Sequence, residues 1–372
     1  FRIFLYKCIF MSNKKSALIA VGGSGGHVFP GLNLALHLID KNYDVNVVTD
    51  KRGFKYSIPF KNINIFILPS SPPIMKNIFT IIYSSILIMF STFRSLIYLI
   101  SNRPSIIFGM GGYASFHICI AAKILNIKFV IYENNFIIGK ANRYLLPLTN
   151  KILVSNKDLK GVPKKYDKKI IQVGNIIRKE ILNFKKEKLD YSKMRILVLG
   201  GSQAAKVFAE VLPTIFKECN DKCISLKIYQ HCLPIQNEEL ISFYKKSNID
   251  FEIFNFSKNL IEYFSKVNLA ITRSGSSMLA ELTNVNIPFI SVPLPSSADN
   301  HQLINANFYK KKNFAFLVEE KDLNNQLLPL IQDVYENNSK LEKIINNQSQ
   351  YSDKNVYNNI NKALEKILNE KN

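Results

Sequence analysis

The stretch that decides the fold is residues 17–50, ALIAVGGSGGHVFPGLNLALHLIDKNYDVNVVTD. An apolar run leads into a loop with four glycines, and a helical pattern and a second apolar run follow. This alternation is typical of a βαβ unit in a parallel sheet. Further strands are predicted for NIFILP, SIIFGMGG, KFVIYENN and KILVSN. The first half of the chain is therefore predicted to be a doubly wound α/β domain.

The pattern starts again near residue 179. After the charged connector KEILNFKKEKLDYSKM, the run RILVLGGSQAA again leads from a strand into a glycine loop, and further strands and helices alternate to FAFLVEE. We therefore predict a second doubly wound domain, with a lysine-rich joint over 176–194. Ligands of open α/β sheets bind at the carboxyl ends of the strands, so the glycine loops of the two domains are expected to face each other across a cleft.

Composition limits the class of protein. The chain has 372 residues, 47% of them hydrophobic and 21% charged, which is typical of globular domains. Subtracting 28 acidic residues from 49 Lys and Arg gives a net charge of +21. This surplus suits nucleic acid, anionic lipid headgroups or phosphorylated substrates, although the general abundance of lysine leaves open that much of it has no function. Residues 1–15 are expected to be a disordered extension, and the ten residues before Met11 are too short for the apolar core of a signal peptide.

The five scattered cysteines suit a reducing compartment better than a secreted protein. Cys219, Cys223, His231 and Cys232 lie close enough in sequence to raise the question of zinc. No CxxC pair is present, and the residues between them read as a buried strand. We therefore expect ordinary core thiols and no metal site.

One apolar segment resembles a membrane span. The run NIFTIIYSSILIMFSTF, residues 77–93, is uncharged but shorter than the roughly 20 residues that a span needs. Its polar side chains lie on one narrow helical face at steps of three, four or seven: Asn77, Thr80, Ser84, Ser91 and Ser95. We predict a helix over 74–100 whose apolar face stays partly exposed, with a fully buried core helix as the alternative.

The first glycine loop, residues 22–31, is a candidate anion site. Its four early glycines let the backbone come close to a ligand at a helix N-terminus. It is neither a P-loop nor the G-x-G-x-x-G dinucleotide fingerprint. His27 in this loop can serve as a general base near neutral pH. Asp50, at the right distance after the loop, keeps an NAD(P)-dependent oxidoreductase as a rival interpretation.

Other polar residues follow strands in both halves. In the first half these are Gly109–Tyr113 and Glu133–Asn135. In the second half they are Gly200–Gln203, Arg273–Ser277 with Glu281, and Asp299–Gln302. Such groups can bind phosphate, ribose and sugar hydroxyls, and Arg178 is a candidate cation for the phosphates. The chain contains no D-x-D pair, so a metal-bound nucleotide diphosphate has no support in the sequence.

The ordered set GGSGGHVFPG, GMGGYAS, ENN, VGNIIR, GGSQ, RSGS…LAEL and DNHQLINA resembles the MurG family of glycosyltransferases over roughly residues 16–310. The resemblance implies the GT-B fold, with a C-terminal helix of about 354–372 packing back on the N-terminal domain. It implies an acceptor- and membrane-binding domain at 16–176 and a UDP-GlcNAc-binding domain at 177–353. The activity implied is inverting transfer of N-acetylglucosamine to the C4 hydroxyl of the muramyl sugar of lipid I, forming lipid II for peptidoglycan.

The resemblance also implies roles for single residues. His27 would be the catalytic base, and Gly111, Gly112 and Tyr113 would belong to the acceptor face. The residues that would contact UDP-GlcNAc are Ser24, Gly25, Gly26, Asn135, Arg178, Ser202, Ser257, Ser276, Ser277, Met278, Leu279, Ala280, Glu281 and Gln302. The resemblance implies a function in cell-wall synthesis, cell shape and cell division. It also implies a peripheral enzyme on the cytoplasmic face of the inner membrane. Its partners would be lipid I and an anionic membrane surface, with no nucleic acid, no metal and no cofactor.

Five positions depart from the family's pattern. Ser24 replaces a threonine, Tyr132 and Asn134 replace a histidine and a glutamine, and Ala204-Ala205 stands where the family has Gly-Ala. Met278 replaces a hydroxyl residue in the ribose-diphosphate segment, which would leave the donor contacts there to backbone N–H groups and serines. Besides the oxidoreductase, a non-catalytic, membrane-docking protein that binds sugar nucleotides remains an alternative.

Overall fold

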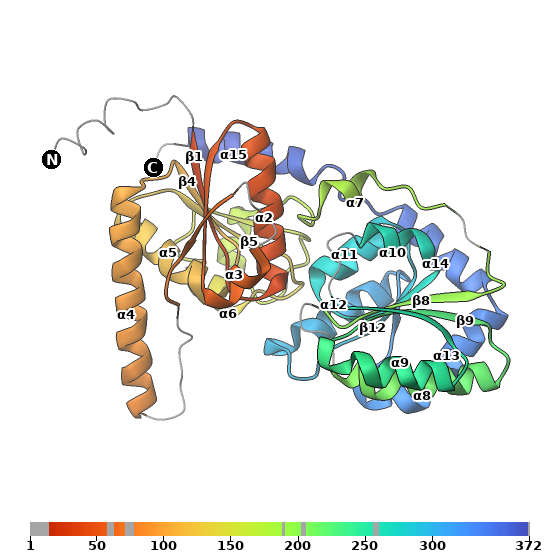
Figure 1. The fold of residues 1–372 in the computed structure, drawn as a ribbon. Coiled ribbons are helices and arrows are strands. Elements are labelled where there is room, and N and C mark those ends of the chain that lie inside the picture. Colours follow the sequence, from red (N-terminus) through yellow and green to blue (C-terminus); the bar gives the residue numbers. More distant parts are fainter. Residues whose placement is uncertain are drawn as a thin grey trace. The chain divides into compact units, whose positions relative to one another are not determined.

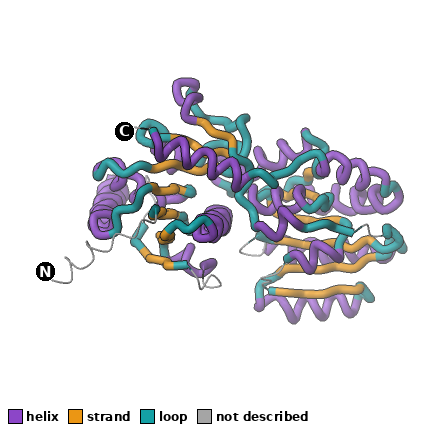
Figure 2. Tube along the Cα trace, turned by 90° about the horizontal axis from the view of Figure 1, so that it is seen from above, coloured by secondary structure: helices purple, strands orange, loops and turns teal. Residues whose placement is uncertain are grey.

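The structure is a computed structural model and describes residues 15–57, 63–70, 78–187, 190–201, 206–255 and 260–370. The described chain forms two compact units (Figure 1). Unit 1 runs to Ile176 and takes up the chain again from Asn355, and unit 2 runs from Ile177 to Lys354. Of the predicted extension, residues 1–14 lie outside the described residues. Figure 2 shows strands with helices on both sides in each unit, as in a doubly wound fold.

Unit 1 is built on a seven-stranded parallel sheet with the strand order β3-β2-β1-β4-β5-β6-β7. Its middle strands are buried on both faces, as their apolar runs predict. The short edge strand β7 was not expected from the sequence. The strands are β1 (Ser16–Ala20), β2 (Asp44–Thr49), β3 (Asn64–Ile67), β4 (Ile106–Gly109), β5 (Phe129–Glu133), β6 (Lys151–Val154) and β7 (Ile170–Gln172).

The helices of unit 1 follow the strands in βαβ order. They are α2 (Gly25–Asp40), α3 (Lys51–Ser57), α4 (Ile78–Ser101), α5 (Gly112–Ile124), α6 (Lys140–Leu145) and α15 (Val356–Asn369), with a 3₁₀ turn at Lys164–Lys169. Helix α2 begins inside the predicted glycine loop, at Gly25, and not after it. Because Gly25 and Gly26 are helical, His27 lies in the first turn of α2 and not in the loop before it.

The C-terminal helix α15 packs in unit 1, as the fold class predicted. His37 Nε2 of α2 lies 2.9 Å from Asn361 Oδ1 of α15. Asn359 Nδ2 donates to Val173 O at 3.1 Å, and Lys128 Nζ donates to Ile367 O at 3.1 Å. The amphipathic face of α15, with Ile360 and Leu364 buried, is thus anchored by polar contacts at its rim.

Unit 2 is built on a six-stranded parallel sheet, β10-β9-β8-β11-β12-β13. The strands are β8 (Met194–Leu199), β9 (Leu226–His231), β10 (Asp250–Phe254), β11 (Leu269–Arg273), β12 (Phe289–Val292) and β13 (Phe316–Leu317). The helices are α7 (Lys179–Asn183), α8 (Lys206–Asp221), α9 (Asn237–Lys246), α10 (Ile261–Lys266), α11 (Ser276–Asn284), α12 (His301–Lys311), α13 (Leu323–Glu336) and α14 (Ser339–Ser349). Three short 3₁₀ turns lie at Pro234–Gln236, Ala298–Asn300 and Glu320–Asp322.

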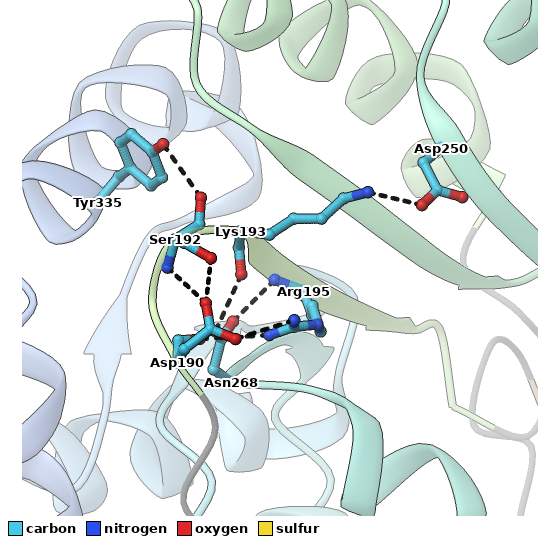
Figure 3. Close-up of polar contacts among 7 residues, drawn as sticks. All are labelled: Asp190, Ser192, Lys193, Arg195, Asp250, Asn268 and Tyr335. Atoms are coloured by element: carbon cyan, nitrogen blue, oxygen red, sulfur yellow. Dashed lines mark hydrogen bonds and ion pairs between the residues drawn. The ribbon is translucent and has the colours of Figure 1, made fainter.

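Polar side chains tie together the amino ends of the strands in unit 2. Asn268, just before β11, accepts from Arg195 N at 2.8 Å and donates to Lys193 O at 3.2 Å, which fixes the start of β8 beside β11. Figure 3 shows the cluster, which consists of Asp190, Ser192, Lys193, Arg195, Asp250, Asn268 and Tyr335. It lies at the end of the sheet opposite the glycine loops, so its role is to hold the fold together.

The cysteines differ in part from the expectation of core thiols. Cys119, Cys219 and Cys232 are buried, whereas Cys223 is exposed in the turn after α8. The structure does not describe Cys8. Cys223 has a φ of 60°, in the left-handed region that commonly ends a helix. The expectation of a core position was therefore wrong for Cys223, because the chain reverses direction there before β9.

Helix α4 buries its serine face and exposes its apolar face, which is the reverse of the usual arrangement. The side chains of Ser84, Ser91 and Ser95 are buried, with 3%, 2% and 1% exposed, and α4 packs against α5. The large apolar side chains point outward: Phe79, Ile82, Tyr83, Ile86, Met89, Phe90, Phe93, Ile97 and Ile100 are all at least half exposed. From Ile78 onward the prediction of a helix with an exposed apolar face is confirmed, and the alternative of a fully buried core helix is wrong. The first predicted residues, 74–77, lie outside the described residues.

By length and composition, Ile82–Ser101 is also apolar enough to cross a bilayer, with 22% of its most apolar window buried. In Figure 1, α4 is the long orange helix beside α5.

Candidate active site

Three loops of unit 1 meet at the carboxyl ends of β1, β4 and β5. Gly22 N donates to Gly111 O at 2.9 Å. A side chain on Gly22 would place its Cβ 2.5 Å from Gly112 Cα, so the two glycine loops touch through their backbones. Gly111 and Gly112 have φ angles of +95° and +77°, a region that side chains disfavour. The glycines predicted for the acceptor face therefore serve a close approach between the two loops.

His27 lies over the second glycine loop. A Cβ on Gly111 would come within 2.7 Å of His27 Cε1, which shows how closely the imidazole packs on that backbone. The third loop reaches the first through Asn134, whose Nδ2 donates to Gly26 O at 3.1 Å. The structure thus brings His27, the Gly111–Tyr113 segment and the Asn134–Asn135 loop together, as the sequence suggested.

Glu133 holds its own loop in place. Its Oε1 accepts from Asn135 N at 3.1 Å and Asn135 Nδ2 at 2.9 Å, and its Oε2 accepts from Gly139 N at 2.9 Å and Asn142 Nδ2 at 3.0 Å. A buried carboxylate with four donors cannot also bind substrate without losing them. Its function is to fix the position of Asn135, the residue predicted to contact the sugar.

Tyr132, which replaces the family's histidine, has a structural partner in unit 1. Its hydroxyl donates to Gly174 O at 3.2 Å and accepts from Ile176 N at 3.0 Å. The tyrosine therefore anchors the last residues before the chain leaves unit 1. This assigns a role to the residue that departs from the family's pattern.

Asp50 is occupied by its own neighbours. Its Oδ1 accepts from Arg52 N at 3.0 Å and Gly53 N at 2.9 Å, and its Oδ2 accepts from Arg52 Nη2 and Ser70 Oγ, both at 3.0 Å. Burial would raise the pKa of Asp50, but the donors from Gly53, Arg52 and Ser70 outweigh this and lower the pKa. The oxygens that a cofactor ribose would need are already in use, which removes the main support for the oxidoreductase.

In unit 2, the first turn of α11 is the predicted site for anionic groups. Its N-cap is Gly275, which has no side chain to cap the first N–H groups, and the positive end of the helix dipole lies there. Ser276, Ser277 and Met278 form this turn, so Met278 can contribute through its backbone whatever its side chain is.

Leu279 and Ala280 follow that turn and have fully buried side chains, and Leu279 N donates to Gly275 O at 3.1 Å. Their side chains pack the helix that carries the serines, so a contact of these two residues with the donor would be made by the backbone. That contact stays a prediction.

Arg178 and Glu281 are paired with each other in the described structure. Arg178 Nε donates to Glu281 Oε1 at 3.0 Å, and Nη2 donates to Oε2 at 2.7 Å, the bidentate geometry of a strong ion pair. Burial would lower the pKa of Arg178, but the Glu281 carboxylate outweighs this and raises the pKa. The sequence separately predicted a phosphate contact and a ribose contact. No sequence signal relates two residues 103 positions apart.

Gln302 is oriented by backbone groups at the end of the same sheet. Its Oε1 accepts from Ser274 N at 3.2 Å and Leu294 N at 3.0 Å. These two bonds fix the side-chain amide and leave its Nε2 group as the donor that could bind a ligand hydroxyl. Asn305 Nδ2 donates to Ser274 O at 3.1 Å and supports the same loop. Gln302 and the first turn of α11 are thus held by one small network.

For several predicted site residues the structure shows little or no environment. Ser202 and Ser257 lie outside the described residues, as do Gln203 and Ala204-Ala205. Ser24 is exposed just before α2. Within the described ranges, no group of three His, Cys, Asp or Glu side chains could hold a metal ion.

A cavity of about 430 Å³ lies elsewhere in unit 2. It is lined by residues of β13, α12, α13 and α14, among them Phe316, Lys310 and Lys343. It contains none of the predicted contact residues. Its position at the edge strand, away from the carboxyl ends of the central strands, separates it from the loops described above.

The two parallel-sheet units, with glycine loops and helix N-termini at the carboxyl ends of their strands, define an α/β protein with two Rossmann-like domains. The structure of MurG from Acinetobacter baumannii covers 95% of this chain and 99% of its own, with a TM-score of 0.75 and 22% identity, which supports the fold. The N-terminal domain of glycosyltransferase family 28 matches residues 17–154 and its C-terminal domain matches residues 195–362. The chain belongs to glycosyltransferase family 28 and is an enzyme.

Curated relatives agree over nearly the full length. A protein of Pelagibacter ubique is 35% identical over 362 residues, covering 96% of this chain and 99% of the relative. A protein of Rickettsia bellii is 32% identical over 321 residues, covering 85% and 88%. Both carry the name UDP-N-acetylglucosamine--N-acetylmuramyl-(pentapeptide) pyrophosphoryl-undecaprenol N-acetylglucosamine transferase.

Proposed function

We propose that this chain transfers N-acetylglucosamine from UDP-GlcNAc to the C4 hydroxyl of the muramyl sugar of undecaprenyl-diphosphate-linked lipid I, forming lipid II. The observation that carries the proposal is the full-length similarity to relatives named for this transfer, spanning both domains of family 28. The contacts of the strand-end loops support it, because they hold polar groups where a nucleotide sugar and a sugar acceptor would need them.

The donor would bind in unit 2. The N–H groups at the start of α11, with Ser276 and Ser277, suit the diphosphate. Glu281, paired with Arg178, suits the two ribose hydroxyls, and Gln302 Nε2 suits a hydroxyl of the sugar. Ser202 and Ser257 are proposed as further donor contacts, the first with phosphate and the second, through its backbone, with uracil.

The acceptor would bind in unit 1, where His27 lies on Gly111 beside Tyr113. As the C4 hydroxyl attacks the anomeric carbon from the face opposite the leaving UDP, the His27 imidazole would take the hydroxyl proton. A positioned base of this kind contributes typically about 10²–10⁴-fold to the rate. Ser24, Gly25 and Gly26 would lie against the donor sugar and diphosphate, and Asn135, fixed by Glu133, would contact the GlcNAc.

Departure of UDP leaves negative charge on the diphosphate. Helix N-termini and backbone N–H groups can meet this charge without reorganising, which is the usual basis of oxyanion-type stabilisation. The proposed reaction uses no metal and no cofactor. Arg178 would act on the donor through its ion pair with Glu281, and its direct contact with phosphate stays a prediction.

The outward apolar face of α4 is proposed to dock the enzyme on an anionic membrane. The serine face that packs on α5 would have to leave its partner for α4 to span the bilayer, whereas an interfacial position requires no rearrangement. The acceptor carries a polyprenyl chain, so a peripheral enzyme on the cytoplasmic face of the inner membrane could reach it there. The chain's net charge of +21 suits anionic headgroups.

The test is an assay in detergent with labelled UDP-GlcNAc and purified lipid I. Formation of labelled lipid II with one UDP released per sugar is the expected result. UDP binding without transfer to any lipid-linked acceptor would instead favour the non-catalytic membrane-docking protein. Sugar transfer to another acceptor in place of lipid I would keep the family and overturn the proposed substrate.

A further inference from the structure

Helix α11 is anchored to both places where the chain passes between the two units. The chain leaves unit 1 after Ile176 and returns to it after Lys354. Arg178, two residues past the first crossover, holds Glu281 of α11 with two hydrogen bonds. Asp353, one residue before the second crossover, holds Asn284 at the end of the same helix. Both anchors lie within unit 2.

The second anchor is reciprocal. Asn284 Nδ2 donates to Asp353 Oδ2 at 2.8 Å, and Asp353 N donates to Asn284 Oδ1 at 2.9 Å. Asp353 is 4% exposed, so this pair is largely shielded from water. Removing one partner of such a pair leaves a buried polar group unsatisfied, which makes the contact costly to lose.

A buried glutamine holds the segment that leads to this crossover. Gln348 Nε2 donates to Ile287 O at 3.0 Å and to Phe314 O at 2.7 Å. Ile287 lies three residues beyond the end of α11. The chain over 348–353 is therefore bound at two points to the end of α11 and the turn that follows it.

A displacement of the C-terminal end of α11 is transmitted along the helix to its first turn. The helix has nine residues, which at 1.5 Å a residue is about 13 Å. A hydrogen-bonded segment of this length moves as one body. Displacements of about 1 Å at a binding site are enough to cost activity, so the anchors at the far end can set the affinity of the first turn.

We propose that Asn284 and Asp353 are positioning residues for the donor site, acting through α11 and touching no substrate themselves. The proposal rests on the proposed function in one respect, namely that the first turn of α11 binds the diphosphate of UDP-GlcNAc. It adds that the affinity of this turn depends on the second crossover of the chain.

A swap of the two side chains tests the pair. In N284D, two carboxylates face each other and the Nδ2 donor is gone. In N284D/D353N, the asparagine amide at 353 can donate to the carboxylate at 284, which still accepts from the backbone N–H of residue 353. We expect N284D to weaken UDP binding about fivefold in calorimetric titration of the full chain, and the double variant to restore it to within about twofold.

The comparison of single and double variants isolates the pair. Asn284 Nδ2 also donates to Ala280 O at 2.9 Å, and both variants lose that bond equally. N347D is the matched control, because Asn347 Nδ2 donates to Asn313 O on an exposed surface of the same unit. This control should leave UDP affinity unchanged.

A lower melting temperature for N284D with unchanged UDP affinity would overturn the proposal and leave a purely structural contact. Failure of the double variant to recover UDP affinity would overturn it as well. If N284D does not fold, N284A takes its place with the same expected loss of affinity. Absence of UDP binding by the unaltered chain would contradict the proposed function itself and is thus distinguishable from either result.

Discussion

Asp50 and Glu133 stand at strand ends and Glu281 lies within α11, and each has its oxygens occupied by its own surroundings. Asp50 and Glu133 bind donors of their own loops, and Glu281 binds Arg178. The sequence located all three correctly as carboxylates near the glycine loops. It could not show what occupies them, because the partners depend on turns and helix starts that no spacing reveals. A ribose contact of Glu281 would have to be accepted alongside its two bonds from Arg178, and it stays a prediction.

Replacement of His27 tests the catalytic assignment. We expect His27→Ala and His27→Asn to lower kcat by about 10²-fold or more, because no other base would take the acceptor proton. UDP affinity should stay close to that of the unaltered enzyme, since most of the proposed UDP contacts lie in unit 2 and His27 is not among the others. The measurements are steady-state lipid II synthesis and calorimetric UDP titration. Near-full turnover by either variant would show that His27 is not the base.

Asp50 should make the stability of unit 1 depend on acid pH. Its pKa is lowered in the fold, so its stabilisation is complete above the unfolded-state pKa of about 3.9 and is lost as the pH falls through the folded value. D50N should cost about 2 kcal/mol of unfolding free energy at pH 7, since charge-assisted bonds to Arg52 and Ser70 are lost. Urea unfolding at pH 7 and near pH 3 measures this. A difference between the two proteins that does not shrink in acid would contradict the assignment.

At the scale of the element, α4 and α11 show what a pattern can and cannot predict. The serine stripe of α4 was visible in the sequence, but periodicity alone does not say which face is buried. Small hydroxyl side chains permit close packing on α5 and satisfy themselves within the helix, as Ser95 Oγ does by donating to Ser91 O at 2.8 Å. The ordinary rule that apolar faces are buried therefore fails in α4.

Replacing Ile82, Ile86 and Phe90 with serine tests the outward face of α4. These side chains are 52%, 55% and 51% exposed, so the triple variant should melt within a few degrees of the unaltered protein. Its binding to anionic liposomes should weaken, because about 25 cal/mol is lost for each Å² of apolar surface that no longer enters the membrane. Replacement of the buried Leu99 with serine should lower the melting temperature and leave the liposome binding of the folded protein unchanged. Unfolding of the triple variant with unchanged vesicle binding would show that another surface meets the membrane.

The helix N-termini also lead to a prediction about metals. If the first turn of α11 and the neighbouring N–H groups meet the diphosphate charge, turnover of UDP-GlcNAc should survive EDTA. The measurement is the initial rate of lipid II formation after chelation and dialysis. Complete loss of activity that Mg²⁺ or Mn²⁺ restores would show that a cation takes part, and the proposed charge balance would then be wrong.

At the scale of the whole molecule, strand runs and the reset near residue 179 predicted two domains, and the resemblance of the motifs indicated the family. The assignment of acceptor to one domain and donor to the other stays a prediction, as does the cleft between them. What the sequence could not indicate is how the crossovers are fixed. Arg178 with Glu281 and Asn284 with Asp353 join residues 103 and 69 positions apart, and only the folded backbone brings them together.

The net charge of +21 belongs to the whole chain, and its role can be separated from that of α4 by salt. Electrostatic attraction to an anionic leaflet is screened as salt rises from about 0.05 to about 0.5 M, whereas insertion of apolar side chains is not. We expect binding to anionic vesicles to weaken severalfold over this range and to leave a salt-resistant remainder. The Ile82, Ile86 and Phe90 triple variant should lose that remainder while keeping the salt-sensitive part. Vesicle co-sedimentation measures both, with neutral vesicles as the control. Equal binding to neutral and anionic vesicles at all salt concentrations would mean that the lysine surplus has no part in docking, and that the apolar face of α4 alone brings the enzyme to its lipid acceptor.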